Sequence, residues 1–392
     1  MTNDHNRPPC NIVICSDGTG NAGGRTNGSN VWRIRQAVAE STQPRYGQKA
    51  RPQIVIYEDG VGSEAATLPR VIGGAFGWGM TRDIKSLYGR LIREFQPGDQ
   101  IYLFGFSRGA FTARTLANLL HICGIADCWH EVEDKKTRTV VRQRRTPEQI
   151  DAIVDKAVEL YKKRHKHKHE CDRFRQTFGR GWPESMRIEG VSERGRFPIR
   201  FVGMWDTVDA LGLPFDNTTQ ALANKGIRGF RLNLQRRGRC WLDWEDDLHP
   251  EIQNAFHAVS IDDERQTFHP VLWLENEPAS EGGRQVLRPK NQSDYVFGGK
   301  RKVEQVWFAG VHANVGGGYP KDQQAHVSLC WMMRHAARDG LAFDEQKWQE
   351  FEQQRDELGR IYDSRAGAGA FYRYKPRPIA ELSERAGIGV PV

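Results

Sequence analysis

The stretch of sequence that decides the fold is residues 100–111, QIYLFGFSRGAF. It begins as a short apolar strand and continues as a helix, and the turn between them fits the pattern Gly-x-Ser-x-Gly. A serine on so sharp a turn needs small residues two positions before and two positions after it, and Gly105 and Gly109 supply that clearance. We therefore predict a nucleophile elbow that exposes the hydroxyl of Ser107 at the end of a buried strand.

The chain alternates strands and helices around this turn. Five short apolar runs are predicted to be strands: residues 11–15, 53–57, 100–104, 198–205 and 305–309. Helical spacing of apolar residues follows the first three of them, over residues 31–40, 81–95 and 111–121. Because strands that alternate with helices form parallel sheets covered on both faces, we predict an α/β fold. The serine turn makes it α/β-hydrolase-like, with a mostly parallel sheet and inserted cap segments.

Changes in composition divide the chain into four predicted parts. Residues 8–125 form the first part of the core and carry the serine turn, and residues 126–196, rich in Lys, Arg and His, form a basic inserted cap. Residues 197–345 complete the core with the acid and base loops and a Trp-rich insertion. Residues 346–392 form a C-terminal helix and an extended tail.

The composition excludes several classes of protein. The chain has 392 residues, of which 40 are glycine and 38% are hydrophobic, so wholesale disorder is excluded. It has neither an apolar run long enough to span a membrane nor an apolar signal segment at its start, and we expect a cytoplasmic protein. The seven cysteines include no Cys-x-x-Cys pair, which disfavours a disulfide framework or a zinc knuckle. The net charge of +8 permits an anionic partner.

A serine nucleophile needs a general base and an acid that orients this base. Asp206 follows the strand at residues 198–205, where a parallel sheet presents its functional groups, and Asp209 is the nearest rival. His312 follows the last predicted strand in a glycine-rich loop and is the preferred base. His257, on a segment predicted to be helical or proline-adjacent, is the runner-up. The chain order Ser, Asp, His is that of the α/β-hydrolases.

Two backbone N–H groups are needed to stabilise the oxyanion of an acyl-transfer reaction. The residue after the nucleophile, Arg108, supplies one of them. The turn at Gly18 and Thr19, after the first strand, supplies the other. The alternative that this turn is structural only stays open.

Four other patterns point to different functions and are less favoured. Residues 16–19 resemble the loop of phosphatases that use an aspartyl nucleophile, but the first aspartate of that loop is absent. The glycine-rich residues 73–79 lack a following Gly-Lys-Ser/Thr and are expected to form a flexible loop near the pocket. The Lys- and His-rich residues 164–169 are expected to be solvated, because their lysines would repel a metal ion. The basic residues 135–145 could contact anionic lipid, whereas nucleic acid is disfavoured without interleaved aromatic residues.

Several separate motifs together resemble a known family. They are Asp17-Gly18-Thr19-Gly20-Asn21, Gly105-Phe106-Ser107-Arg108-Gly109-Ala110, Trp205-Asp206-Thr207-Val208, His257-Ala258 with Asp263-Glu264-Arg265, Trp307-Phe308-Ala309-Gly310-Val311-His312 with Gly316-Gly317-Gly318-Tyr319, and Tyr362-Asp363-Ser364 with Tyr374-Lys375-Pro376-Arg377-Pro378. In this order they resemble the family that includes the first class of type VI secretion lipase effectors, the Tle lipases. The resemblance implies an α/β-hydrolase acting on phospholipids, with Ser107, Asp206 and His312 as its catalytic triad.

We therefore predict a serine carboxylic-ester hydrolase with an acyl-serine intermediate, which the resemblance specifies as a phospholipase or lipase. The open alternatives are an esterase for a small soluble ester and a non-catalytic binding module on the same scaffold. The predicted chemistry requires no cofactor and no metal. The expected partners are a lipid or ester substrate, an anionic membrane surface and a secretion-apparatus or immunity protein, but not nucleic acid. Delivery by a signal-peptide-independent secretion system is also implied.

Overall fold

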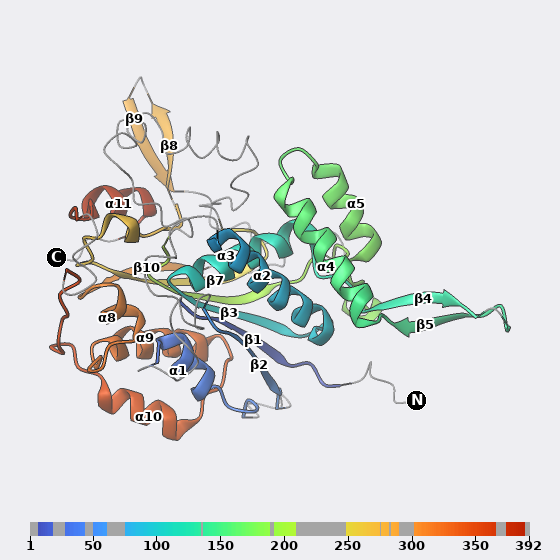
Figure 1. Cartoon of the computed structure of the whole chain (residues 1–392), viewed down its shortest axis with the longest axis horizontal. Helices are drawn as coiled ribbons and strands as arrows, with labels where there is room; N and C mark the ends of the chain where they lie inside the picture. Colours follow the sequence, from blue (N-terminus) through green and yellow to red (C-terminus); the bar gives the residue numbers. More distant parts are fainter. Residues whose placement is uncertain are drawn as a thin grey trace.

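The computed structural model of the chain (Figure 1) describes residues 7–18, 28–43, 50–60, 75–134, 136–188, 192–208, 248–274, 276–281, 284–289, 302–365 and 374–388. Thr19, Asp209 and the predicted Trp-rich insertion around Trp241 and Trp244 lie outside the described residues.

The centre of the molecule is a parallel β-sheet. In the described part of the chain it consists of β1 (Asn11–Ser16), β2 (Gln53–Glu58), β3 (Gln100–Phe106), β6 (Ile199–Trp205), β7 (Ile252–Ser260) and β10 (Lys302–Phe308). Their order is β10-β7-β6-β3-β1-β2, and every neighbouring pair is parallel. The winding of the chain reverses between β1 and β3, which is where sheets of this kind bind their ligands. The predicted α/β fold is confirmed.

Helices cover both faces of the sheet (Figure 1). On one face lie α1 (Asn30–Ala37), α9 (Ala325–Arg338) and α10 (Glu345–Gln354), and on the other α2 (Ala75–Glu94) and α3 (Arg108–Cys123). Side chains of β1 alternate between the two faces. Ile12 and Ile14 pack with α2 and α3, whereas Val13 and Cys15 pack with α1 and α9. Burial on both sides explains why this strand is an uninterrupted apolar run.

Two elements differ from the sequence prediction. His257 lies in strand β7, at an inner position of the sheet, and not on a helical or proline-adjacent segment. The polar residues Asn254 and His257 interrupt the apolar pattern of this strand, but each has a partner: the Asn254 amide donates to Asp339 Oδ1 at 2.8 Å, and His257 accepts from the backbone N–H of Thr207 at 3.1 Å. Further, α2 begins at Ala75, so residues 75–79 of the predicted glycine-rich loop are helical.

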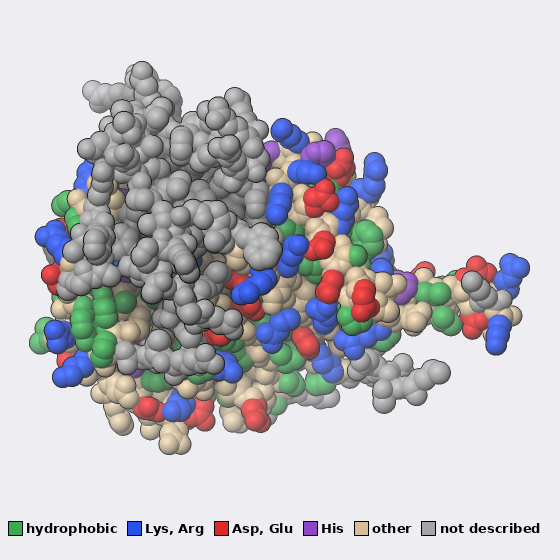
Figure 2. Space-filling model, in the orientation of Figure 1, with side chains coloured by type: hydrophobic (Ala, Val, Ile, Leu, Met, Phe, Trp, Pro, Cys, Tyr) green, Lys and Arg blue, Asp and Glu red, His purple; other side chains and the backbone are tan. Residues whose placement is uncertain are grey.

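The segment predicted as an inserted cap follows α3. Its elements are β4 (Trp129–Glu133), β5 (Val140–Arg144), α4 (Pro147–Lys162) and α5 (Lys168–Phe178). α4 packs against α2 and α3 through an apolar face that joins the main core. β4 and β5 form an antiparallel hairpin that projects from the body of the molecule, as Figure 2 shows. The limits of the four predicted parts, and the role of this segment as a cap, stay predictions.

The last part of the chain returns to the carboxyl ends of the strands. β8 (Asn276–Glu281) and β9 (Arg284–Pro289) form a second hairpin, and α8 (His312–Gly316) follows β10. The predicted tail contains a helix, α11 (Ile379–Ala386), whose Ser383 hydroxyl accepts the indole N–H of Trp307 at 2.9 Å. Among the helices that the structure describes, none combines the length and the apolar character needed to cross a membrane.

Candidate active site

The predicted serine turn joins β3 directly to α3. Ser107 has φ 58° and ψ −125°, a strained conformation for a residue other than glycine. Its backbone N–H donates to the carbonyl of Trp205, the last residue of β6, at 3.0 Å. The turn is thus held against the end of the neighbouring strand. Ser107 is 6% exposed, so it is a buried residue and not the surface-exposed serine that the sequence predicts.

Neighbouring backbone atoms leave no space for a side chain at either glycine of the turn. A Cβ atom on Gly105 would lie 2.5 Å from Cα of Ala110. A Cβ atom on Gly109 would overlap the carbonyl oxygen of Ser16 at the end of β1. The pattern Gly-x-Ser-x-Gly is therefore required here by the close approach of α3 to β1 and of the turn to α3 itself.

The structure brings His312 and Asp206 into direct contact. The imidazole Nδ1–H donates to Asp206 Oδ2 at 2.6 Å. Asp206 directly follows β6, with φ 36°, and His312 begins α8 after β10. β7 lies between these strands, and the loop after β10 folds back over its end: the N–H of Gly310 donates to Asp262 Oδ2 at 2.6 Å and its carbonyl accepts from the N–H of Asp262 at 3.1 Å.

Asp206 is fully buried among hydrogen-bond donors. Its Oδ1 accepts from the backbone N–H of Ser260 and its Oδ2 from the Ser260 hydroxyl, both at 2.9 Å. The guanidinium of Arg377 donates to both carboxylate oxygens, at 3.0 and 3.3 Å. Burial alone would raise the pKa of Asp206, but the charge of Arg377 and the hydrogen bond from His312 outweigh it and hold the pKa well below its ordinary value. Asp206 is thus ionised.

His312 lies between two aromatic rings beside the serine turn. Its imidazole is 4.6 Å from the ring of Phe106, the residue before Ser107, and 4.8 Å from the ring of Phe268. Its backbone N–H donates to Asp263 Oδ2 at 3.0 Å. Burial lowers the pKa of His312, against the opposing effect of Asp206, so the imidazole is neutral at neutral pH. Among the described residues no hydrogen bond joins the Ser107 hydroxyl to this imidazole.

His257, the runner-up for the base, has a different environment. It is fully buried in β7, and its Nε2 accepts from the N–H of Thr207, so that its Nδ1–H donates to Gln305 Oε1 at 3.3 Å. Burial, aided by the charge of Arg114, lowers the pKa of His257 to about 3. Both ring nitrogens are therefore engaged in neutral hydrogen bonds between β7 and its neighbours.

The two predicted oxyanion donors lie in different environments. Arg108 is the first residue of α3, so its N–H lies at the helix N-terminus, directly after Ser107. Gly18 follows β1, next to the serine turn, but its N–H donates to Asp17 Oδ1 at 2.6 Å. The other oxygen of this carboxylate accepts from Ser29 Oγ at 2.6 Å and from the Tyr57 hydroxyl at 2.7 Å. The Gly18 amide is therefore already engaged.

Arg377 is the residue that sequence reasoning missed. Its guanidinium contacts Asp206, the carbonyl of Ser260 and the carbonyl of Phe268, the last at 2.5 Å. The signal available in the sequence was only the motif around residues 374–378, which carries no indication of a partner 171 positions earlier. No described group of three or more His, Cys, Asp and Glu side chains is arranged to hold a metal ion, and His167 of the Lys- and His-rich run pairs with Glu170 at 2.7 Å.

One known protein family matches most of the chain. The family described as type VI secretion system phospholipase effector Tle1-like, catalytic domain, matches residues 10–335. The chain belongs to this family. The match contains Ser107, Asp206 and His312, whereas Arg377 of this Tle1-like chain lies beyond it.

Three proteins to which this chain is similar are distant from it in sequence and longer. An uncharacterized protein of Saccharomyces cerevisiae is 23% identical over 282 residues, which cover 69% of the Tle1-like chain and 33% of the relative. Among solved structures, an uncharacterized protein from Pseudomonas aeruginosa is 17% identical with a TM-score of 0.45, covering 88% of this chain and 48% of that one. The Tle1 effector bound to the VgrG spike of the type 6 secretion system is 16% identical with a TM-score of 0.36, covering 81% and 55%. The chain thus spans about a third to a half of their lengths.

Proposed function

We propose that this Tle1-like chain is a serine carboxylic-ester hydrolase that cleaves acyl esters of phospholipids. The observation that carries the proposal is the 2.6 Å hydrogen bond from a neutral His312 to an ionised Asp206, beside the strained turn of Ser107. Strain at a buried serine is the kind of backbone feature that persists at functional sites. Membership of a phospholipase effector family supports the phospholipid as the substrate class.

In the proposed first step His312 acts as the general base. Its Nδ1–H is held by Asp206, so Nε2 is the nitrogen that accepts the proton of the Ser107 hydroxyl. This hydrogen bond forms when substrate occupies the site, because catalytic hydrogen bonds often tighten only in the complex. Asp206 stays ionised and stabilises the imidazolium that results, and Arg377 keeps Asp206 in its charged form.

The serine oxygen then bonds to the ester carbonyl carbon, and the carbonyl oxygen becomes an oxyanion. The N–H of Arg108 stabilises this charge from the N-terminus of α3. The second donor is an N–H of the turn at Gly18 and Thr19, and Gly18 can serve only if its bond to Asp17 is released. The intermediate collapses when the alcohol part leaves with the proton from His312. Water, deprotonated by His312, then releases the fatty acid from Ser107.

Family membership also supports a route and partners for the protein. We infer delivery by a type VI secretion system, with a component of that apparatus and an immunity protein as binding partners.

A fluorophosphonate probe tests the proposed nucleophile. Purified protein, Ser107→Ala and Ser185→Ala are incubated with the probe, with a short-chain ester and with mixed phospholipid vesicles. Ser185 is an exposed serine at the opposite end of the sheet and serves as the matched control. We expect labelling and fatty-acid release by the wild type and by Ser185→Ala, and neither by Ser107→Ala. Ester cleavage without lipid release would indicate a small soluble ester, and absence of all labelling would favour the non-catalytic module.

A further inference from the structure

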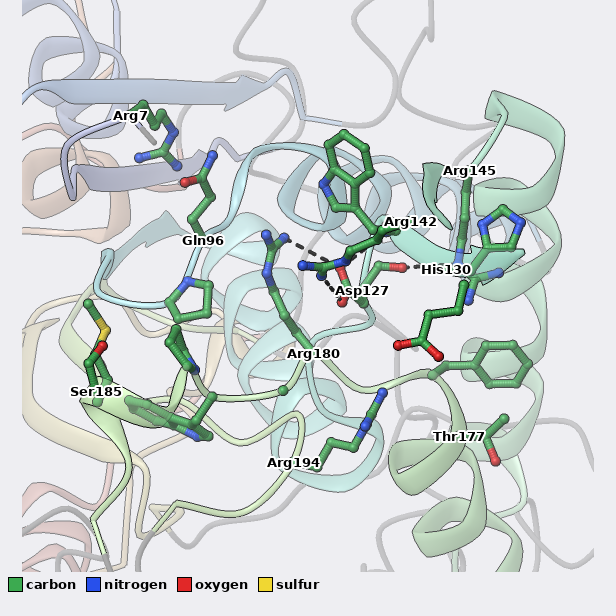
Figure 3. Close-up of a pocket in the computed structure, with 18 of the residues that line it drawn as sticks. Arg7, Gln96, Asp127, His130, Arg142, Arg145, Thr177, Arg180, Ser185 and Arg194 are labelled. Atoms are coloured by element: carbon green, nitrogen blue, oxygen red, sulfur yellow. Dashed lines mark hydrogen bonds and ion pairs between the residues drawn. The ribbon is translucent and has the colours of Figure 1, made fainter. Parts of the chain in front are cut away.

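A cavity of about 840 Å³ lies at the end of the sheet opposite Ser107. It is lined by Pro9, which precedes β1, by Gln96 and Pro97, which precede β3, and by parts of the segment between α3 and β6 (Figure 3). A strand rises about 3.3 Å per residue, so β3 puts roughly 20 Å between this cavity and Ser107. Its volume is that of a small-molecule site, and the proposed hydrolysis makes no use of it.

The cavity carries an excess of positive charge. Five of its lining side chains are basic: Arg7, Arg142, Arg145, Arg180 and Arg194. Two are acidic: Asp127 and Glu131. Arg7 is neutralised by Asp99, outside the lining, at 2.5 Å. The remaining four arginines face two carboxylates, which leaves an excess of two positive charges. One phosphate dianion has the charge that balances this excess.

Two of these arginines are fixed through their Nε atoms. Arg145 is anchored by its Nε, which donates to the carbonyl of Asp127 at 3.1 Å. Arg194 is anchored in the same way on the carbonyl of Gly179 at 2.8 Å. Within the described part of the chain the terminal guanidinium nitrogens of both have no hydrogen-bond partner. A guanidinium fixed by its Nε keeps a two-nitrogen fork that matches the oxygens of a phosphate.

The carbonyls of Asp127 and Gly179, which hold the two arginines, belong to segments that are hydrogen-bonded to each other. The N–H of Asp127 donates to the carbonyl of Phe178 at 2.7 Å, and Ala126 and Gly179 form a β-bridge. Arg180, which follows, is buried and donates to the carbonyl of Phe95 at 2.5 Å. Figure 3 shows Arg142 and Arg180 directed at Asp127, from which they lie 2.7 and 3.9 Å away. The basic groups are therefore organised before any ligand arrives.

The cavity also has a flat apolar wall, which is the indole of Trp182. The indole of Trp182 is fixed by donation to the carbonyl of Arg196 at 3.0 Å and by stacking on Phe197 at 4.6 Å. A ring or acyl group attached to the anion would rest against this wall.

We propose that this cavity binds an organic phosphate, with the phosphate between Arg145 and Arg194 and the apolar part against Trp182. A free phosphate ester and the phosphate of a lipid headgroup share this chemistry. In either case the site is separate from Ser107, so its test does not depend on the proposed hydrolase function.

Calorimetric titration of the full chain with phenyl phosphate, inorganic phosphate and phenol tests the proposal. We expect phenyl phosphate to bind more tightly than inorganic phosphate, and phenol not to bind. The variant Arg145→Gln/Arg194→Gln should weaken phenyl phosphate binding at least ~10-fold, because both charged forks are lost. The control Arg82→Gln/Arg385→Gln removes the same charge from exposed positions of α2 and α11, outside the cavity, and should leave the affinity unchanged within about twofold, since distant exposed charges are screened.

A vesicle assay distinguishes the two sources of the phosphate. Protein carrying Ser107→Ala, which prevents lipid hydrolysis, is sedimented with phosphatidylcholine vesicles with or without phosphatidic acid. Sedimentation that needs phosphatidic acid, Arg145 and Arg194 assigns a lipid headgroup, whereas phenyl phosphate binding without sedimentation assigns a free phosphate ester. The proposal is overturned if no phosphate compound gives saturable binding at millimolar concentration, or if the cavity variant binds as tightly as its control. Because Arg194 is exposed, Arg194→Gln alone provides a variant whose folding is not at risk.

Discussion

The guanidinium of Arg377 lies 3.0 Å from Oδ1 and 3.3 Å from Oδ2 of Asp206, across 171 positions of sequence. Both side chains are fully buried. The same guanidinium donates to the carbonyls of Ser260 and Phe268, so it also ties together the loops beside His312. Arg377, which lies beyond the residues that the family matches, therefore keeps Asp206 in its ionised form.

Replacement of Arg377 is expected to impair both activity and stability. Arg377→Met leaves a buried carboxylate without its cation, and breaking such a pair costs about 3–5 kcal/mol of unfolding free energy. We expect kcat/KM to fall at least ~10-fold, because Asp206 is less firmly oriented against His312. Arg377→Lys, which keeps the charge but not the two-nitrogen fork, should be intermediate. Urea unfolding and ester hydrolysis measure these effects.

The matched control is Arg385→Met, an exposed arginine of α11 in the same segment. The pH profile separates an electrostatic role from a structural one. Without the cation, Asp206 favours the imidazolium of His312 more strongly, so the acid limb of kcat/KM should move to higher pH. Equal stability and an unchanged profile in Arg377→Met would contradict the role given to Arg377.

The pH dependence of hydrolysis follows from His312. Burial lowers its pKa, so the acid limb of kcat/KM should have its midpoint below the ordinary histidine value of about 6.5. Activity is lost as the pH falls through that midpoint, because the protonated imidazole cannot accept the proton of Ser107. A profile of kcat/KM between pH 4.5 and 8 measures it. An acid limb above about 6.5 would be inconsistent with a neutral buried base.

His257 is expected to destabilise the protein in acid. Its pKa is about 3 in the folded chain, against about 6.5 when unfolded, so between these values only the unfolded chain binds the proton. Stability should therefore fall by about 1.4 kcal/mol for each pH unit below 6.5 from this residue alone. His257→Gln removes this contribution, and urea unfolding at pH 6.5, 5.5 and 4.5 should show a smaller slope than in the wild type. An equal slope would show that the pKa of His257 is not lowered in the folded chain.

The glycines of the serine turn are expected to be intolerant of a side chain. Gly109→Ala places a Cβ atom against the carbonyl of Ser16, and the backbone must shift, at a cost of about 1–3 kcal/mol or more. Gly181→Ala is the matched control, because a Cβ atom there meets nothing within 4 Å. Thermal unfolding should separate the two variants by several degrees. Similar midpoints would show that α3 can move away from β1 without loss.

The sequence by itself determined the features that depend on residues close together in the chain. The apolar runs of β1, β2, β3, β6 and β10 predicted their strands, because strands buried on both faces carry few polar residues. The serine turn was also predictable, since Gly105 and Gly109 meet a local steric requirement. Chain order and strand ends then selected Asp206 and His312, which the structure brings into contact.

Only the tertiary structure decided what depends on partners distant in sequence. β7 was missed because Asn254 and His257 are polar, and their hydrogen bonds to Asp339, Thr207 and Gln305 cannot be read from the residues around them. Arg377 was missed for the same reason, since its partner lies on another loop. Because these groups are buried, each contact makes a large contribution to the free energy of unfolding. A polar or charged group removed from water depends on its new partners for stabilisation.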